Sequence, residues 1–186
     1  TRVRDFELYF YATKQKSRLP AGKTLTEEPA VGMTWDEARG FCQWLTEVER
    51  SEDNLGPTQR YRLPTDPEWS VAAGLGRETG KTPADKSTKI RGVYPWGKQW
   101  PPPARAGNYA GEEIGVLGPR LTGYNDGFKN VAPVGSFAAN GLGVFDLGGN
   151  VWEWCEDENQ PGSGRRVVRG GSFVEHAPEV LLSSTR

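Results

Sequence analysis

The sequence predicts an α+β fold with two main helices, short antiparallel strands and much irregular loop. Two capping boxes, each followed by apolar residues at helical spacing, indicate the two helices. Short apolar runs separated by paired glycines near the end of the chain indicate the strands. The 24 glycines and 14 prolines make up 38 of the 186 residues. This excess is typical of many tight turns in a folded domain and falls short of the content that indicates disorder.

The helices begin at recognisable capping signals. Thr34 with Glu37 opens the longer one, and Thr65 with Glu68 opens the shorter one. Phenylalanine and tyrosine at helical spacing predict a further short helix over 3–13. The apolar face of the longer helix is predicted to carry Trp35, Ala38, Phe41, Cys42, Leu45 and Val48.

The strand predictions are short and lie mostly late in the chain. They cover 61–63, 144–147, 151–155 and 166–169. Between the helices and the last strands, the stretch 75–145 shows little regular pattern. A structureless stretch of this length is unusual in a compact domain, so a bound ion or a functional surface would account for it.

Charge and hydropathy exclude several classes of protein. The 23 basic and 24 acidic residues give a formal net charge of −1, without a basic run, which argues against a dedicated nucleic-acid binder. No apolar stretch approaches the length of a membrane span. The first residues, 1–5, do not form a signal peptide, so the compartment stays unknown. The length predicts a single domain over 1–186.

Cysteine and histidine usage limits the chemistry. Cys42 and Cys155 do not form a disulfide framework, and both are expected to be packed thiols. The single histidine, His176, excludes a zinc site with several histidines and is expected in an exposed loop. Most aromatic residues are expected in the core, although Trp96 and Trp100 lie in the irregular region and are placed to line a groove.

The segment 151–155 contains the first candidate site. As a strand, it places Val151, Glu153 and Cys155 on one face and the two tryptophans on the other. Either the tryptophans face the core and Glu153 faces water, or Glu153 is buried. A buried carboxylate needs a cation or strong donors, and Asp146, across the double-glycine bend, is placed to share that cation.

The irregular region contains the second candidate site. Asn108-Tyr109 and Asp126-Gly127-Phe128 combine side-chain oxygens with loop carbonyls. Calcium accepts this mixture of hard oxygen ligands. The Asn-Asp-Gly pattern is also a turn signal, so an ion site and a simple turn both remain open on these residues alone.

Six short segments, in order along nearly the whole chain, carry a family resemblance. They are Trp35-Asp36-Glu37-Ala38 running to Phe41-Cys42, Tyr61-Arg62-Leu63-Pro64-Thr65 with Glu68-Trp69, Tyr94-Pro95-Trp96-Gly97, Ala132-Pro133-Val134-Gly135-Ser136-Phe137, Gly149-Asn150-Val151-Trp152-Glu153-Trp154 and Arg169-Gly170-Gly171-Ser172-Phe173. Together they resemble the formylglycine-generating enzyme family, also called the sulfatase-modifying-factor family.

The resemblance implies a variant of the C-type-lectin-like fold with two bound calcium ions. The first implied site consists of the side chains of Asn108 and Asp126 with the carbonyls of Tyr109 and Phe128. The second consists of the side chains of Asp146 and Glu153 with the carbonyls of Gly149 and Val151. Calcium is therefore the cofactor that we expect.

The same resemblance argues against the family's oxidation reaction. Its oxidising members hold copper(I) with two cysteines five positions apart, just after the Arg-Gly-Gly-Ser motif. Glu175 and Val180 occupy those positions here, so copper is not expected and the chain leans away from being an enzyme.

Two functions follow from the resemblance. The first is a non-catalytic, calcium-stabilised binding or accessory domain of a bacterial multidomain protein, similar to modules of signalling proteins that include kinases. The alternative is an enzyme of this family with divergent oxidative chemistry. The protein or small-molecule partner is unknown. Family domains also extend beyond both ends of this chain, so we expect 1–186 to be truncated at both ends.

Overall fold

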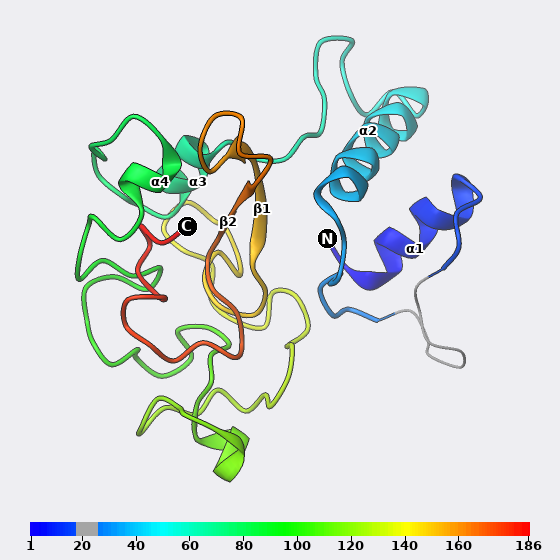
Figure 1. Ribbon diagram of the computed structural model, residues 1–186. Helices are drawn as coiled ribbons and strands as arrows, with labels where there is room; N and C mark the ends of the chain where they lie inside the picture. The colour runs from blue at the N-terminus through cyan, green and yellow to red at the C-terminus, as the bar shows by residue number, and fades with distance from the viewer. Residues whose placement is uncertain (18–25) are drawn as a thin grey trace. The chain divides into compact units, whose positions relative to one another are not determined.

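The computed structural model describes residues 1–17 and 26–186, and it divides the chain into two compact units. The N-terminal unit spans Thr1–Leu63, and the C-terminal unit spans Pro64–Arg186 (Figure 1). Each unit is described by itself below. The expectation of one domain over the whole chain stays a prediction.

Two helices form the N-terminal unit, α1 (Val3–Ala12) and α2 (Trp35–Ser51). Both were predicted, and the Thr34 capping box is confirmed. The Thr34 backbone N–H donates to Glu37 Oε2 at 2.8 Å, and the Glu37 N–H donates to Thr34 Oγ1 at 3.3 Å. These two bonds satisfy donors that the start of a helix leaves without intrahelical partners.

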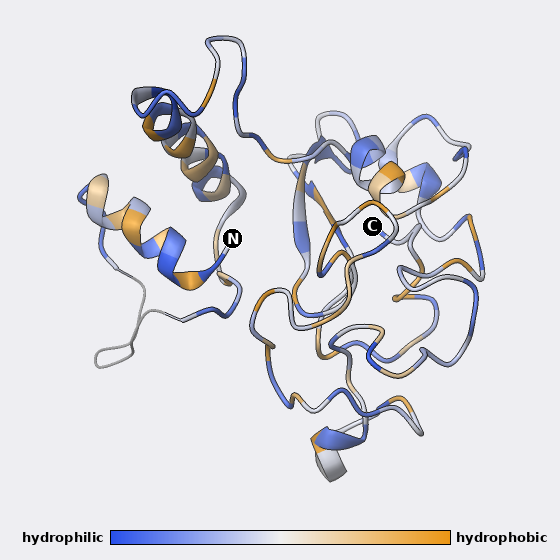
Figure 2. Ribbon diagram, turned by 180° about the vertical axis from the view of Figure 1, so that it is seen from behind, coloured by the Kyte–Doolittle hydropathy of each residue, from blue (hydrophilic) through white to orange (hydrophobic). Residues whose placement is uncertain are grey.

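Aromatic rings join α1 to α2. The rings of Phe6 and Phe41 stack at a centroid distance of 4.8 Å, and Tyr9 and Phe10 complete the buried cluster. Gly40 permits the close approach, because a Cβ there would lie 2.4 Å from the hydroxyl oxygen of Tyr9. Orange and blue residues alternate around both helices in Figure 2, as expected for amphipathic helices.

The strand predicted over 61–63 is wrong. The segment is irregular, because the Tyr61 backbone N–H donates to Thr46 Oγ1 of α2 at 2.9 Å rather than to a neighbouring strand. The backbone of this segment is therefore bonded to a helix side chain, whereas the predicted strand would have paired with another strand.

The C-terminal unit combines short helices with one small antiparallel sheet, which confirms the α+β class. Its elements are α3 (Asp66–Ala72), α4 (Pro83–Lys86), the 3-10 helix η1 (Glu112–Leu117), β1 (Glu153–Glu158) and β2 (Arg166–Arg169). β1 pairs with β2 in a register that places Glu153 opposite Arg169. The helix predicted from Thr65 and the strand predicted over 166–169 are both confirmed.

Two other strand predictions need correction. The segment 144–147 consists of irregular backbone and bends, and the strand predicted over 151–155 begins two residues later and extends to Glu158. The cause is a change of backbone direction at Asn150, whose φ of 61° is left-handed. Its N–H donates to the carbonyl of Asn108 at 2.8 Å, so this backbone is bonded to a loop before the sheet begins.

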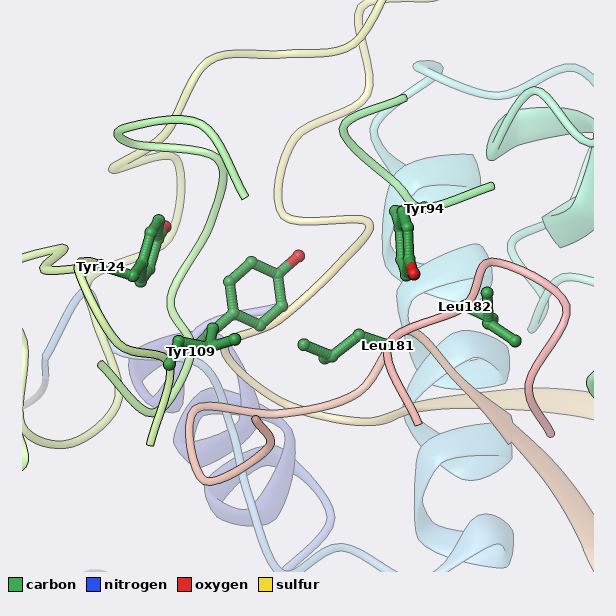
Figure 3. Packing of buried hydrophobic residues seen from close by; sticks show 6 residues of the cluster. Tyr94, Tyr109, Tyr124, Leu181 and Leu182 are labelled. Carbon is green, nitrogen blue, oxygen red and sulfur yellow. The ribbon is translucent and has the colours of Figure 1, made fainter. Parts of the chain in front are cut away.

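The largest buried cluster of the C-terminal unit is built from loop residues. It contains Tyr94, Tyr109, Leu121, Tyr124, Leu181 and Leu182 (Figure 3). Tyr109 is fully buried, and the Tyr124 hydroxyl donates to the carbonyl of Gly107. Large rings therefore supply a core that so little regular structure would not otherwise provide.

A buried ion network joins α3 to β2 and to the end of the described chain. Asp66 is fully buried and accepts from the guanidinium groups of both Arg169 and Arg186. Arg186 Nη2 also donates to Glu78 Oε2 at 2.8 Å, and Lys86 Nζ lies 3.8 Å from Asp66 Oδ2. Two buried carboxylates are thereby balanced by two buried guanidinium groups.

Candidate functional site

Glu153, at the start of β1, faces the interior. Its Oε2 accepts a hydrogen bond from Trp69 Nε1 at 2.6 Å, and Trp69 packs with Cys155 and Val167 in a buried cluster. Glu153 is half-buried, as are Trp152 and Trp154, and its carboxylate is directed to Trp69 rather than to water. Burial raises the pKa of Glu153 to about 7, and the nearby charge of Asp146 adds to the rise.

Asp146 provides the second carboxylate of this site. Its backbone adopts a left-handed φ of 53°, and its Oδ2 accepts from the Gly135 N–H at 2.6 Å. The other oxygen, Oδ1, is buried without a hydrogen-bond partner. Neither Asp146 nor Glu153 pairs with a basic side chain in the described part of the chain. An unpartnered buried oxygen beside a second carboxylate is the environment that a hard cation would satisfy.

The second candidate site centres on Asn108 and Asp126. Asn108 is fully buried, and its Nδ2 donates to the carbonyl of Asn130 at 2.8 Å, while its Oδ1 has no partner. Asp126 accepts from the backbone N–H groups of Tyr109 and Phe128 at 2.8 and 2.9 Å. The structure thus brings the four predicted residues together, and Asn108 contributes a free acceptor that fits calcium.

Glu113 of η1 is a further acidic residue near Asp126 that sequence reasoning missed. Its Oε1 accepts from the Gly111 N–H at 2.7 Å, and its Oε2 is buried without a partner. Burial raises the pKa of Asp126, and the charge of Glu113 raises it further. The adjacent acidic pair at 112–113 was visible in the sequence, but the short helix that places it was not predicted.

Asn150 links the two candidate sites. Its Oδ1 accepts from the Ala132 N–H at 2.9 Å and from Asn108 Nδ2 at 3.2 Å. The neighbouring Gly149 is required for this approach, because a Cβ there would lie 2.4 Å from the carbonyl oxygen of Asn108. The backbone hydrogen bond from the Asn150 N–H to the Asn108 carbonyl therefore connects the segments that carry the two sites. Direct ligation by the carbonyls of Gly149 and Val151 stays a prediction.

Neither cysteine is among the residues of the two candidate sites. Cys42 is half-buried in α2 and Cys155 is fully buried in β1, and neither forms a disulfide. Burial raises the pKa of the Cys155 thiol to about 12. Within residues 1–17 and 26–186, no group of three or more His, Cys, Asp and Glu side chains is placed to hold a metal ion.

The model of the sulfatase-modifying factor enzyme 1-like domain matches residues 9–186. The chain belongs to this family. It is 33% identical over 168 residues to the inactive C-alpha-formylglycine-generating enzyme 2 of Mus musculus, which covers 86% of this chain and 44% of that protein. It is 30% identical over 176 residues to the formylglycine-generating enzyme of Thermomonospora curvata, covering 83% of this chain and 48% of that protein.

Other comparisons concern domain context and fold. The serine/threonine-protein kinase pkn1 of Chlamydia caviae is 30% identical over 131 residues, which are 70% of this chain and 14% of the kinase. Among solved structures, PvdO from Pseudomonas aeruginosa superposes with a TM-score of 0.64 at 21% identity, covering all of this chain and 70% of PvdO. The chain thus spans less than half of the length of the curated relatives above. No helix among its described residues is long and apolar enough to cross a membrane.

In calcium-free buffer, the stability of the protein should fall as the pH rises from about 4.5 to about 7. Over this range the folded state keeps a proton on Glu153, whose pKa is about 7, while the unfolded state, with the ordinary value of 4.5, has lost it. The free energy of unfolding should drop by up to about 3 kcal/mol. Urea unfolding of wild type and Glu153→Gln across this pH range measures the difference. An equal slope in the two proteins would contradict the assignment.

Proposed function

We propose that this chain is a non-catalytic, calcium-stabilised binding or accessory domain of a bacterial multidomain protein. The observation that carries the proposal is the identity of the residues at the two copper positions of the family. Glu175 and Val180 stand there, and Glu175 Oε1 accepts from Trp152 Nε1 at 3.3 Å. A carboxylate and a valine do not fit copper(I), which prefers soft thiolate ligands.

The two cysteines belong to different units of the chain. Cys42 belongs to the N-terminal unit, and Cys155 lies in the buried cluster beside Trp69 in the C-terminal unit. A thiol with a pKa near 12 stays protonated at neutral pH, so Cys155 is a poor nucleophile and a poor metal ligand. A relative that matches most of this chain is named an inactive formylglycine-generating enzyme, which supports the same function.

Calcium suits both candidate sites. Asn108 Oδ1 and Asp146 Oδ1 are buried acceptors without partners, and each lies beside a carboxylate whose pKa is raised by burial. A divalent cation would favour the ionised carboxylates and satisfy these oxygens. It would stabilise loops that lie outside the helices and strands.

The kinase relative supports the multidomain context. The segment similar to this chain makes up only 14% of that bacterial kinase. A domain of this family therefore exists as part of a larger protein, and we propose the same arrangement here.

A copper-dependent oxidation of a Cys-x-Pro-x-Arg peptide is not expected. The protein lacks the dithiolate that would hold copper(I) after Arg-Gly-Gly-Ser. Mass spectrometry of the peptide after incubation with protein, copper(I) and oxygen is the measurement. Conversion of the peptide thiol to an aldehyde, absent from a metal-free control, would show that the domain is an enzyme.

Calcium should raise the thermal midpoint of the protein, and a chelator should lower it. At a calcium concentration about 100-fold above Kd, one site adds about 2.7 kcal/mol, which corresponds to a rise of about 5–10 °C. Glu153→Gln should lose much of this rise, because the amide keeps an acceptor for Trp69 but removes a charged ligand. Glu179→Gln, an exposed carboxylate outside both sites, serves as the control. A midpoint insensitive to calcium and chelator would contradict calcium stabilisation.

A further inference from the structure

A cavity of about 370 Å³ lies in the C-terminal unit, between the loop that carries Trp96 and the loop that carries Val144. Its lining is mixed: the apolar side chains of Pro95, Phe137 and Leu147 lie beside polar groups that include Arg105 and Asp146. The volume is within the range of protein sites that bind small molecules or single side chains. Residues 172–180, which include the two copper positions of the family, do not line it.

Trp96 is a rigid wall of this cavity. Its ring stacks on Tyr94 with a centroid distance of 4.9 Å and meets the edge of Tyr109 at 5.1 Å. The indole Nε1 donates to the carbonyl of Gln99 at 2.8 Å. Trp100, which is 39% exposed, packs against the same stack. An incoming side chain would therefore meet an aromatic surface that is already held in place, so little further ordering is required.

The loop over 140–145, which supplies Val144 to the cavity, is also held in place. Asn140 Oδ1 accepts from the N–H groups of Leu142 and Val144 at 2.9 and 3.1 Å, and Asn140 Nδ2 donates to the carbonyl of Ala72 at 2.7 Å. The loop thereby presents Leu142, Val144 and Phe145 to solvent, where they are 65%, 36% and 54% exposed. Exposed apolar side chains that lie together on a surface are typical of a binding site.

Charge indicates which partner fits. Residues 86–111 contain five basic side chains and no acidic one. The basic residues are Lys86, Lys89, Arg91, Lys98 and Arg105. Only Lys86 pairs with a described carboxylate, Asp66, and the other four are exposed. Arg105 lines the cavity, and among the described residues its side chain makes one hydrogen bond, from Nη2 to the carbonyl of Ser136 at 3.0 Å, which leaves other donors for an anion.

The cavity lining contains one acidic residue in addition to Arg105. Asp146 is at the wall, but its Oδ1 is buried and its Oδ2 accepts from Gly135. Trp96, Phe137 and Leu147 give an apolar side chain a surface on which to pack.

We propose that this cavity binds an acidic peptide segment of a protein partner. An aromatic or aliphatic side chain of the peptide enters between Trp96 and Val144, and a neighbouring carboxylate pairs with Arg105. The inference rests on the proposed function of a binding domain and names the chemistry of its partner. Trp96 and Arg105 belong to no candidate metal site, whereas Asp146, which also lines the cavity, belongs to one.

Fluorescence polarisation with a labelled Gly-Glu-Asp-Phe-Glu-Asp-Gly peptide tests the proposal. The comparison peptides replace the phenylalanine by serine or all four acidic residues by lysine. We expect the acidic phenylalanine peptide to bind at least about tenfold more tightly than either. The preference over the lysine peptide should shrink as salt is added, since screening weakens exposed charge pairs. Equal binding of all three peptides, or displacement by a poly(dT) oligonucleotide, would overturn the proposal.

Variants locate the site. Arg105→Gln should weaken binding about fivefold at low salt, whereas Arg165→Gln, an exposed arginine in the turn between β1 and β2, should bind like wild type. Trp96→Ala should lose about tenfold. If that variant does not fold, Val144→Glu gives the same test, because it places a carboxylate at an exposed wall of the cavity. Wild-type affinity in both Arg105→Gln and Val144→Glu would contradict this location.

The two proposals fail in different ways. Peptide binding without any effect of calcium on the thermal midpoint would retain this inference and reject calcium stabilisation. A calcium-dependent midpoint without peptide binding would do the reverse. Copper-dependent oxidation of the cysteine peptide would reject the non-catalytic function. The peptide-binding inference would still be decided by the affinity for the acidic peptide.

Discussion

One buried carboxylate, Asp66, organises the C-terminal unit. Its two oxygens accept from Arg169 of β2 and from Arg186, and Arg186 also donates to Glu78. Asp66 and Arg169 lie 103 residues apart in the sequence. A sheet of two short strands does not bring such distant segments together, so the buried ion network performs this task. Removing one member of such a network leaves an uncompensated buried charge, which is strongly destabilising.

The network also reaches the candidate calcium site. The guanidinium carbon of Arg169 lies 4.3 Å from the centroid of the Trp69 ring, and the indole N–H of Trp69 donates to Glu153. Glu153 in turn lies opposite Arg169 in the β1–β2 register. One set of contacts therefore holds β2, α3 and the carboxylate together. The same packing buries Glu153 without a basic partner, which explains both its raised pKa and the suitability of the site for a cation.

The sequence predicted those features that depend on local signals. The capping pairs at Thr34 and Thr65 lie within one helical turn, so α2 and α3 begin where the pattern indicates. The start of β1 and the inward orientation of Glu153 depend on contacts with Asn108 and Trp69, which are distant in the sequence. The family resemblance indicated the oxygen-bearing residues of both sites. It did not indicate Glu113 or the linking role of Asn150, because their placement depends on the packing of loops.

The unfolding free energy of Asp66→Asn, measured by urea titration, tests most directly whether the buried network holds the C-terminal unit together. The substitution preserves the volume of the side chain but removes the charge that balances Arg169 and Arg186. We expect a loss of about 3–5 kcal/mol. Asp53→Asn, at an exposed residue with a left-handed φ of 60° that asparagine adopts readily, should change stability by less than about 0.5 kcal/mol. A loss below about 1 kcal/mol in Asp66→Asn would contradict the account.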